Sequence, residues 1–112
     1  MNDSRFNEYR TLWTMVLFDL PVKTKKDRKE YTKFRKALMK DGFHQFQFST
    51  YLRHSFSREN AEVHKKRVKF VLPPKGKVGI LSITDKQFGM MEIFDGQSRE
   101  ETERPPQQLD MF

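Results

Sequence analysis

The hydrophobic pattern of the chain begins with an apolar run at residues 13–18, which ends on a carboxylate at Asp19. Leu20 and Pro21 follow, and a proline cannot donate a hydrogen bond within a central strand. A continuous apolar run is typical of a strand that is covered on both faces. The sequence therefore predicts a central, fully covered strand over residues 13–19, with Asp19 at its carboxyl end.

A helix is predicted next, within residues 22–43. Thr24 is a favourable N-cap, Asp27 stands three residues later as in a capping box, and Gly42 suits the position just beyond a helix end. Its apolar side chains follow the spacing of one buried stripe, namely Tyr31, Phe34 and Leu38.

Residues 43–56 alternate between two sets of side chains, which indicates strand structure. One set is Phe46, Phe48, Thr50 and Leu52, and the other is Gln47, Ser49, Tyr51 and Arg53. The length allows either one kinked strand or a very short hairpin, and the pattern does not choose between them.

A second helix is predicted over residues 58–72, capped by Ser57. Its buried face would carry Ala61, His64, Val68 and Val71. The segment PPKGK that follows is a turn, because prolines end the helix and Gly76 allows a reversal. We then expect a strand at KVGILSI, a connection at TDKQFG and a last short strand at MMEIF.

The predicted order β-α-β(β)-α-β-β favours an α+β sandwich of ferredoxin-like type, an antiparallel sheet with two helices on one face. The other sheet face would be bare and apolar, and a second copy is its simplest cover, so we expect a homodimer through the sheet. The expected organisation is an N-terminal extension (1–12), the ferredoxin-like domain (13–96) and a flexible acidic tail (97–112). The tail ends on large apolar residues, which either dock a partner or fold back on the body of the chain: Leu109, Met111 and Phe112.

Composition excludes several classes of protein. The 112 residues contain no cysteine, which removes disulfides, thiolate zinc sites and cysteine catalysis. No apolar stretch approaches the roughly 18–20 residues of a membrane span. The N-terminal residues lack the apolar region of a signal peptide, so we expect no membrane association and a cytoplasmic protein.

The net charge of +7 indicates a polyanionic partner, and nucleic acid is the commonest one. No element suited to base readout is evident, so binding would track phosphates on double-stranded DNA, with single-stranded RNA as a second candidate. The candidate phosphate contacts lie mainly on the two helices and are Lys25, Lys26, Arg28, Lys29, Lys33, Lys36, Arg53, Lys65, Lys66 and Arg67.

Asp19 is the one candidate for a metal-binding or catalytic residue, because a carboxylate at the end of a central strand lies at the rim of the sheet. Alone, such a residue is more often a turn former than a ligand. In a two-fold dimer, however, two Asp19 side chains could face each other and share a cation. Magnesium suits such a bridge, since it accepts one or two carboxylates and keeps several waters. A metal bound there could support phosphodiester cleavage.

Five motifs resemble, in order and spacing, the Cas-two family of small CRISPR-associated proteins, most closely its type II versions. They are FDLPV, KKDRKEYTKFRKALMKDGF, QFSTY, LPPKGKVGIL and TDKQFGMMEIF, and the resemblance as a whole spans residues 13–94. The resemblance implies a ferredoxin-like homodimer in which Asp19 binds Mg²⁺ at the dimer interface as the catalytic carboxylate. It also implies that Phe18, Ser49 and Tyr51 lie next to that site.

The resemblance further implies a role in spacer acquisition, in which the dimer bridges integrase dimers of the Cas-one family and holds duplex DNA. Members are described as metal-dependent endoribonucleases, and some also cleave double-stranded DNA, so a Mg²⁺-dependent endonuclease is the second hypothesis. A toxin-like metal-dependent ribonuclease acting on mRNA is the third. The N-terminal extension has no counterpart in the family pattern, and the acidic tail is longer than that of compact members.

Overall fold

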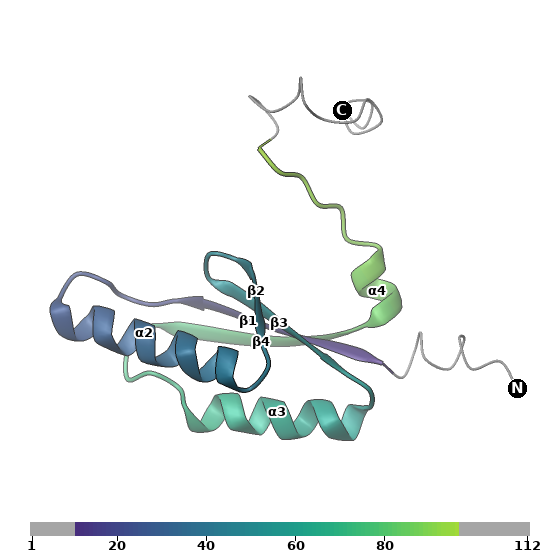
Figure 1. Cartoon of the computed structure of the whole chain (residues 1–112), viewed down its shortest axis with the longest axis horizontal. Helices are drawn as coiled ribbons and strands as arrows, with labels where there is room; N and C mark the ends of the chain where they lie inside the picture. Colours follow the sequence, from purple (N-terminus) through teal and green to yellow (C-terminus); the bar gives the residue numbers. More distant parts are fainter. Residues whose placement is uncertain (1–10, 97–112) are drawn as a thin grey trace, which may run out of the picture.

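The computed structural model describes residues 11–96, which contain four strands and three helices. In chain order they are β1 (Leu12–Asp19), α2 (Lys25–Lys40), β2 (His44–Gln47), β3 (Thr50–Ser55), α3 (Arg58–Phe70), β4 (Lys77–Thr84) and α4 (Asp85–Gly89). The result is an α+β fold, as predicted (Figure 1).

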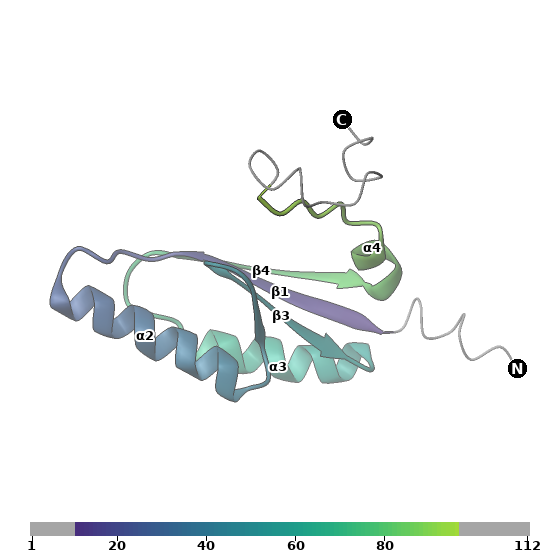
Figure 2. The same cartoon turned by 45° about the horizontal axis from the view of Figure 1, so that its top comes forward.

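A four-stranded antiparallel sheet has the order β2-β3-β1-β4, so β1 is flanked on both sides. The central position predicted for this strand is therefore confirmed. The helices α2 and α3 lie on one face of the sheet, whereas α4 lies on the other (Figures 1 and 2). We call the face away from α2 and α3 the open face.

The core lies between the sheet and the two long helices. Alternate residues of β1 point into it, and Val16 and Phe18 are buried there. The ring of Phe18 meets that of Phe34 edge-to-face, with centroids 5.2 Å apart. Burying large aromatic side chains in this way contributes much of the stability of so small a domain. The remaining members of the cluster are Leu20, Leu38, Phe43, Tyr51 and Val68.

Both long helices begin where their caps predict. Thr24 accepts a hydrogen bond from the backbone N–H of Asp27, whose carboxylate accepts one from the backbone N–H of Thr24, which completes the capping box. Gly42 has a φ of 92°, the left-handed conformation expected just beyond α2. The hydroxyl of Ser57 caps α3. This helix ends at Phe70 rather than at the predicted residue 72, so Val71 is its C-cap and is 37% exposed.

The segment after α2 is a hairpin, which decides the question that the alternating pattern left open. A turn at residues 48–49 and a register shift between Gln45 and Gln47 break the single alternation. As a result Phe48 is 75% exposed in the turn, while Tyr51 is completely buried on the helix side. The hairpin is one of the two alternatives that the pattern allowed, and the alternation of residues 46–53 does not continue through its turn.

The C-terminal part of the fold also differs from the prediction. The expected connection TDKQFG contains α4, which Thr84 and Gln87 begin with a second capping box. The expected strand at MMEIF is absent from the part of the chain that the structure describes, where residues 91–95 have no regular structure. Trp13 holds α4 on the open face, since its Nε1 donates to Asp85 Oδ1 at 2.7 Å and its ring stacks on Phe88 with centroids 4.4 Å apart.

The open face is therefore only partly covered. Near Met15 it is shielded, and this side chain is 8% exposed. Leu17, farther along β1, is 40% exposed, and Leu81 of β4, directly opposite Met15, is 50% exposed. The predicted coverage of β1 on both faces thus holds for one half of the strand only. No helix among residues 11–96 has the length and apolarity to cross a membrane.

Candidate functional site

Asp19 is the last residue of β1 and is exposed on the open face. Its neighbour across the ladder is Lys77 of β4, and the side chains of directly opposed residues point to the same face. The backbone of Asp19 lies directly against Gly76, whose φ is 91°. A Cβ on Gly76 would lie 2.7 Å from the carbonyl oxygen of Asp19 and 2.6 Å from Leu20, so only glycine allows this close approach.

The residues predicted to lie next to Asp19 divide into two groups. Ser49 is close through the backbone, because its carbonyl accepts a hydrogen bond from the N–H of Phe18 at 3.0 Å. The side chains of Phe18 and Tyr51 instead point into the core, on the opposite side of the sheet from Asp19. Tyr51 accepts a hydrogen bond at its hydroxyl from Arg35 Nε at 2.8 Å. Its place in the structure is that of a core residue.

One chain alone does not supply enough ligands near Asp19 to hold a metal ion. Among residues 11–96, no group of three or more His, Cys, Asp or Glu side chains could hold a metal ion. Asp19 supplies a carboxylate, the donor type that magnesium prefers, but one carboxylate is an incomplete protein site. The residues therefore fit magnesium only if a second chain brings its own Asp19 to the first.

The first helix carries most of the predicted phosphate contacts. Its exposed cations form a basic surface on the outer side of α2 and consist of Lys25, Lys26, Arg28, Lys29, Lys33 and Lys36. Arg28 is partly engaged, because it donates to the carbonyls of Val22 and Lys23 at 3.1 and 3.0 Å. The five lysines have the arrangement that sequence-independent binding of phosphates requires, which is positive charge spread along one surface.

The other predicted phosphate contacts differ from one another in exposure and in their partners. Lys66 of α3 is exposed, whereas Lys65 is half-buried and pairs with Glu62 at 3.0 Å. Arg53 of β3 is also half-buried, and a Cβ placed on Gly42 would collide with its guanidinium. Packing against the backbone after α2 is thus the role that the structure gives Arg53. Its contact with nucleic acid stays a prediction.

Arg67 takes part in a polar cluster that the sequence did not indicate. Its guanidinium donates to Asp41 Oδ1 at 2.8 Å, and His64 Nδ1 lies 2.8 Å from Asp41 Oδ2. Burial raises the pKa of Asp41, but the hydrogen bonds and charges of Arg67 and His64 outweigh it and hold this pKa below its ordinary value. The cluster joins the end of α2 to α3. Sequence reasoning missed it because Asp41 stands more than twenty residues before His64 and Arg67.

Two other predictions concern the ends of the chain. The docking role of Leu109, Met111 and Phe112 lies outside the described residues, as does most of the N-terminal extension. Both remain predictions. Lys77 is the residue beside Asp19 that the sequence analysis did not single out. The only available signal was its place in KGK, directly after a turn that returns the chain to the end of β1.

Comparison with known proteins agrees with the fold and with the quoted motifs. A family described as CRISPR associated protein Cas2 matches residues 12–91. A protein of Flavobacterium psychrophilum named CRISPR-associated endoribonuclease Cas2 is 57% identical over 109 residues, covering 97% of this chain and 95% of that protein. A protein of Parvibaculum lavamentivorans with the same name is 48% identical, covering 90% of this chain and 100% of that protein.

A solved structure described as the crystal structure of Cas2 has the same fold. Its TM-score is 0.53 at 18% identity, and the match covers 79% of this chain and 92% of that chain. At this identity the likeness supports the fold alone. The family match and the two relatives, which extend over most of the chain, carry the assignment: the chain belongs to the CRISPR-associated Cas2 family.

Proposed function

We propose that this protein is a homodimeric scaffold of CRISPR adaptation, which holds duplex DNA by its phosphates and bridges dimers of the Cas-one integrase during spacer acquisition. The observation that carries the proposal is the division of the two faces of the sheet. Exposed apolar side chains and Asp19 lie on the open face, and the exposed lysines of α2 lie on the helical side. One face suits a second copy, and the other suits a polyanion.

Dimerisation through the open face would cover Leu17 and Leu81, which are 40% and 50% exposed. It would also bring the Asp19 carboxylates of two chains together if the two-fold axis passes near the end of β1. Two close carboxylates repel each other unless a proton or a cation lies between them. The charge of Lys77 beside Asp19 reduces this repulsion, and magnesium would complete the neutralisation.

A metal-dependent endonuclease activity is the second part of the proposal. Asp19 is the carboxylate that would hold magnesium, which when bound supplies Lewis-acid stabilisation for phosphodiester hydrolysis. The two relatives are named endoribonucleases, and this favours RNA as a substrate of the site. The basic surface of α2 would position the nucleic acid without reading its sequence.

The test compares wild type with Asp19→Ala in the presence of the partner integrase, duplex DNA and magnesium. We expect the variant to bind duplex and to integrate spacers as wild type does, while any magnesium-dependent cleavage is lost. Failure of the variant to bind duplex would contradict the division of roles between the two faces. Loss of integration by a complex that still assembles would show that the metal site takes part in acquisition itself.

A charge-reversal pair tests the helical side independently. Lys29→Glu and Lys33→Glu on α2 should weaken duplex binding and reduce its dependence on salt, because each phosphate contact releases counterions. Lys86→Glu on α4, on the other side of the sheet, is the matched control and should change binding less. Equal losses in all three variants would mean that affinity follows net charge rather than the helical surface.

A further inference from the structure

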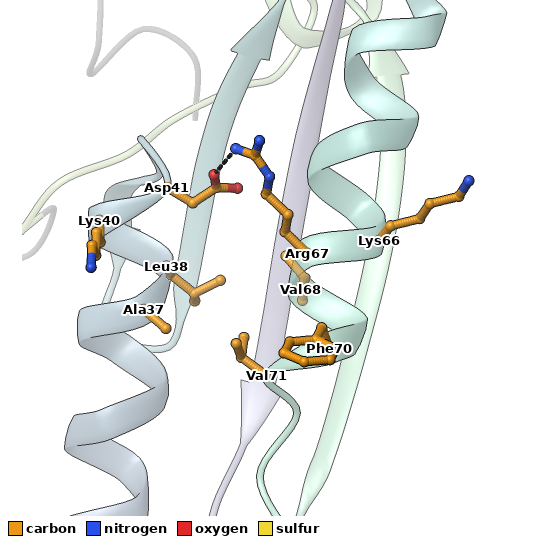
Figure 3. Close-up of a pocket in the computed structure, with 9 residues that line it drawn as sticks. All are labelled: Ala37, Leu38, Lys40, Asp41, Lys66, Arg67, Val68, Phe70 and Val71. Carbon is orange, nitrogen blue, oxygen red and sulfur yellow. Dashed lines mark hydrogen bonds and ion pairs between the residues drawn. The ribbon is translucent and has the colours of Figure 1, made fainter.

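An apolar groove runs between the C-terminal halves of α2 and α3, on the side of the molecule away from the open face (Figure 3). Its volume is about 630 Å³. Buried Leu38 and Val68 form its floor, and Val71 is part of its wall. Phe70 stands at its edge and is 91% exposed, the highest value among the large apolar residues that the structure describes.

The groove continues beyond Phe70 into a second hollow of about 300 Å³. The two share Ala37, Phe70 and Val71, and the second adds Leu72, which is 47% exposed. The exposed apolar side chains therefore form a track along the boundary of the helices rather than isolated surface residues. Such contiguous apolar surface is characteristic of a binding site.

Cations flank the track. Lys40 lies beside the first hollow, whereas the second has Lys33 together with Glu30, so the excess of positive charge is at the first hollow. Arg67 reaches across the upper end of the groove to Asp41, so the carboxylate there is already neutralised (Figure 3). Lys66 extends from α3 in the direction away from α2 (Figure 3). The groove thus combines an apolar floor with a positive border, which suits a peptide with apolar anchors and acidic neighbours.

Two other occupants fit less well. A second copy of the chain seated face to face would oppose one positive border to another. Nucleic acid would leave the apolar floor and Phe70 without matching groups along its phosphates. A homodimer through the open face would leave this groove uncovered, because the groove lies on the opposite side of the sheet.

We propose that the groove binds the C-terminal segment of this chain, residues 97–112, either within one chain or between two chains. The segment holds the required chemistry. Residues 99–112 contain four acidic and two basic side chains, and Leu109, Met111 and Phe112 surround Asp110. Because α4 lies on the open face, the segment must pass around an edge of the sheet to reach the groove. Sixteen extended residues reach about 50 Å, compared with a longest dimension of 46 Å for the structure.

The absence of cysteine from the sequence allows a direct test by disulfide trapping in the full chain. Met111→Cys is combined with Val71→Cys, which lies in the groove, or with Val63→Cys, its matched control on α3. Val71 and Val63 are 37% and 44% exposed, so the two sites offer comparable access to a free thiol. Under mild oxidation we expect the Val71 pair to form a disulfide about tenfold faster, as a modest binding preference would produce.

Charge gives a second readout in the same assay. Lys40→Glu should slow trapping at Val71, whereas Lys66→Glu, the same charge change on a side chain directed away, should slow it much less. Non-reducing gels separate a disulfide within one chain from a disulfide between two chains, and both support the proposal. Unfolding temperatures of the cysteine variants confirm that each is folded.

Equal trapping rates at Val71 and Val63 would overturn the proposal, because they would reflect random collisions of the segment. The groove would then be left for an acidic segment of another protein or for a second copy. This result would not affect the proposed scaffold function, which rests on the open face and on the lysines of α2.

Discussion

Asp19 and Lys77 are directly opposed across the β1–β4 ladder, at the point where β1 ends. Both are exposed on the open face, so a cation stands beside the carboxylate that is proposed to bind magnesium. The lysine lowers the local negative charge that would attract a divalent ion. The two residues therefore set the strength of the proposed metal site together.

Replacing Lys77 with alanine should strengthen magnesium binding at Asp19. A unit charge about 6 Å from a divalent ion in water changes its affinity roughly tenfold at low salt. Titration calorimetry with Mg²⁺ measures the change, and Lys69→Ala on α3 is the control for loss of one positive charge. Unchanged affinity in Lys77→Ala, or an equal gain in Lys69→Ala, would argue against a metal site beside Lys77.

The same substitution should strongly reduce stability on one helix and leave it nearly unchanged on the other. Phe34 is 2% exposed and packs against Phe18, so Phe34→Ala should cost about 3–5 kcal/mol in the free energy of unfolding. Phe70 is 91% exposed, and Phe70→Ala should change this free energy by no more than about 0.5 kcal/mol. Denaturant unfolding of both variants checks the contrast, which a large loss in Phe70→Ala would contradict.

Two glycines make a second matched pair. Gly76→Ala should destabilise by at least about 1–2 kcal/mol, because alanine disfavours a φ of 91° and its Cβ would meet the backbone of Asp19. Gly89 ends α4, and nothing lies within 4 Å of the position of its Cβ. Gly89→Ala should therefore leave stability unchanged or raise it by up to about 1 kcal/mol. Thermal unfolding of the two variants gives the comparison.

Asp41 should contribute stability that depends on acid pH. Its pKa in the folded protein is below the ordinary 3.8, so the unfolded chain takes up the proton first as pH falls. The advantage of wild type over Asp41→Asn should be complete above the ordinary pKa and disappear as pH falls through the folded value. Unfolding free energies between about pH 5 and pH 2 measure this. A constant difference across that range would show that the charge of Asp41 contributes nothing.

Local signals account for the elements that the sequence predicted well. The capping box of Thr24 and Asp27, the cap at Ser57 and the glycine after α2 act within a few residues, and the structure confirms them. The apolar run of β1 likewise identified the centre of the sheet. Asp19 could be chosen as a candidate because the end of a central strand lies at the rim of a sheet.

Long-range contacts account for what the sequence did not indicate. Tyr51 is buried in the core, and the turn and register shift that separate β2 from β3 hid from the sequence pattern which residues of β3 face the helices. The segment after β4 begins with α4, and Trp13, more than seventy residues earlier, holds this helix on the open face. The hydrophobic pattern of residues 84–94 alone does not indicate the contact with Trp13.

The sequence by itself determined the two long helices, the central strand and the family, because caps, periodicity and motifs are properties of neighbouring residues. Only the tertiary structure decided which side chains meet. It placed Lys77 opposite Asp19, joined Asp41 to His64 and Arg67, and opened the groove beside Phe70. These relationships depend on strand register and on the packing of two helices, and both are set by contacts between residues that are distant along the chain.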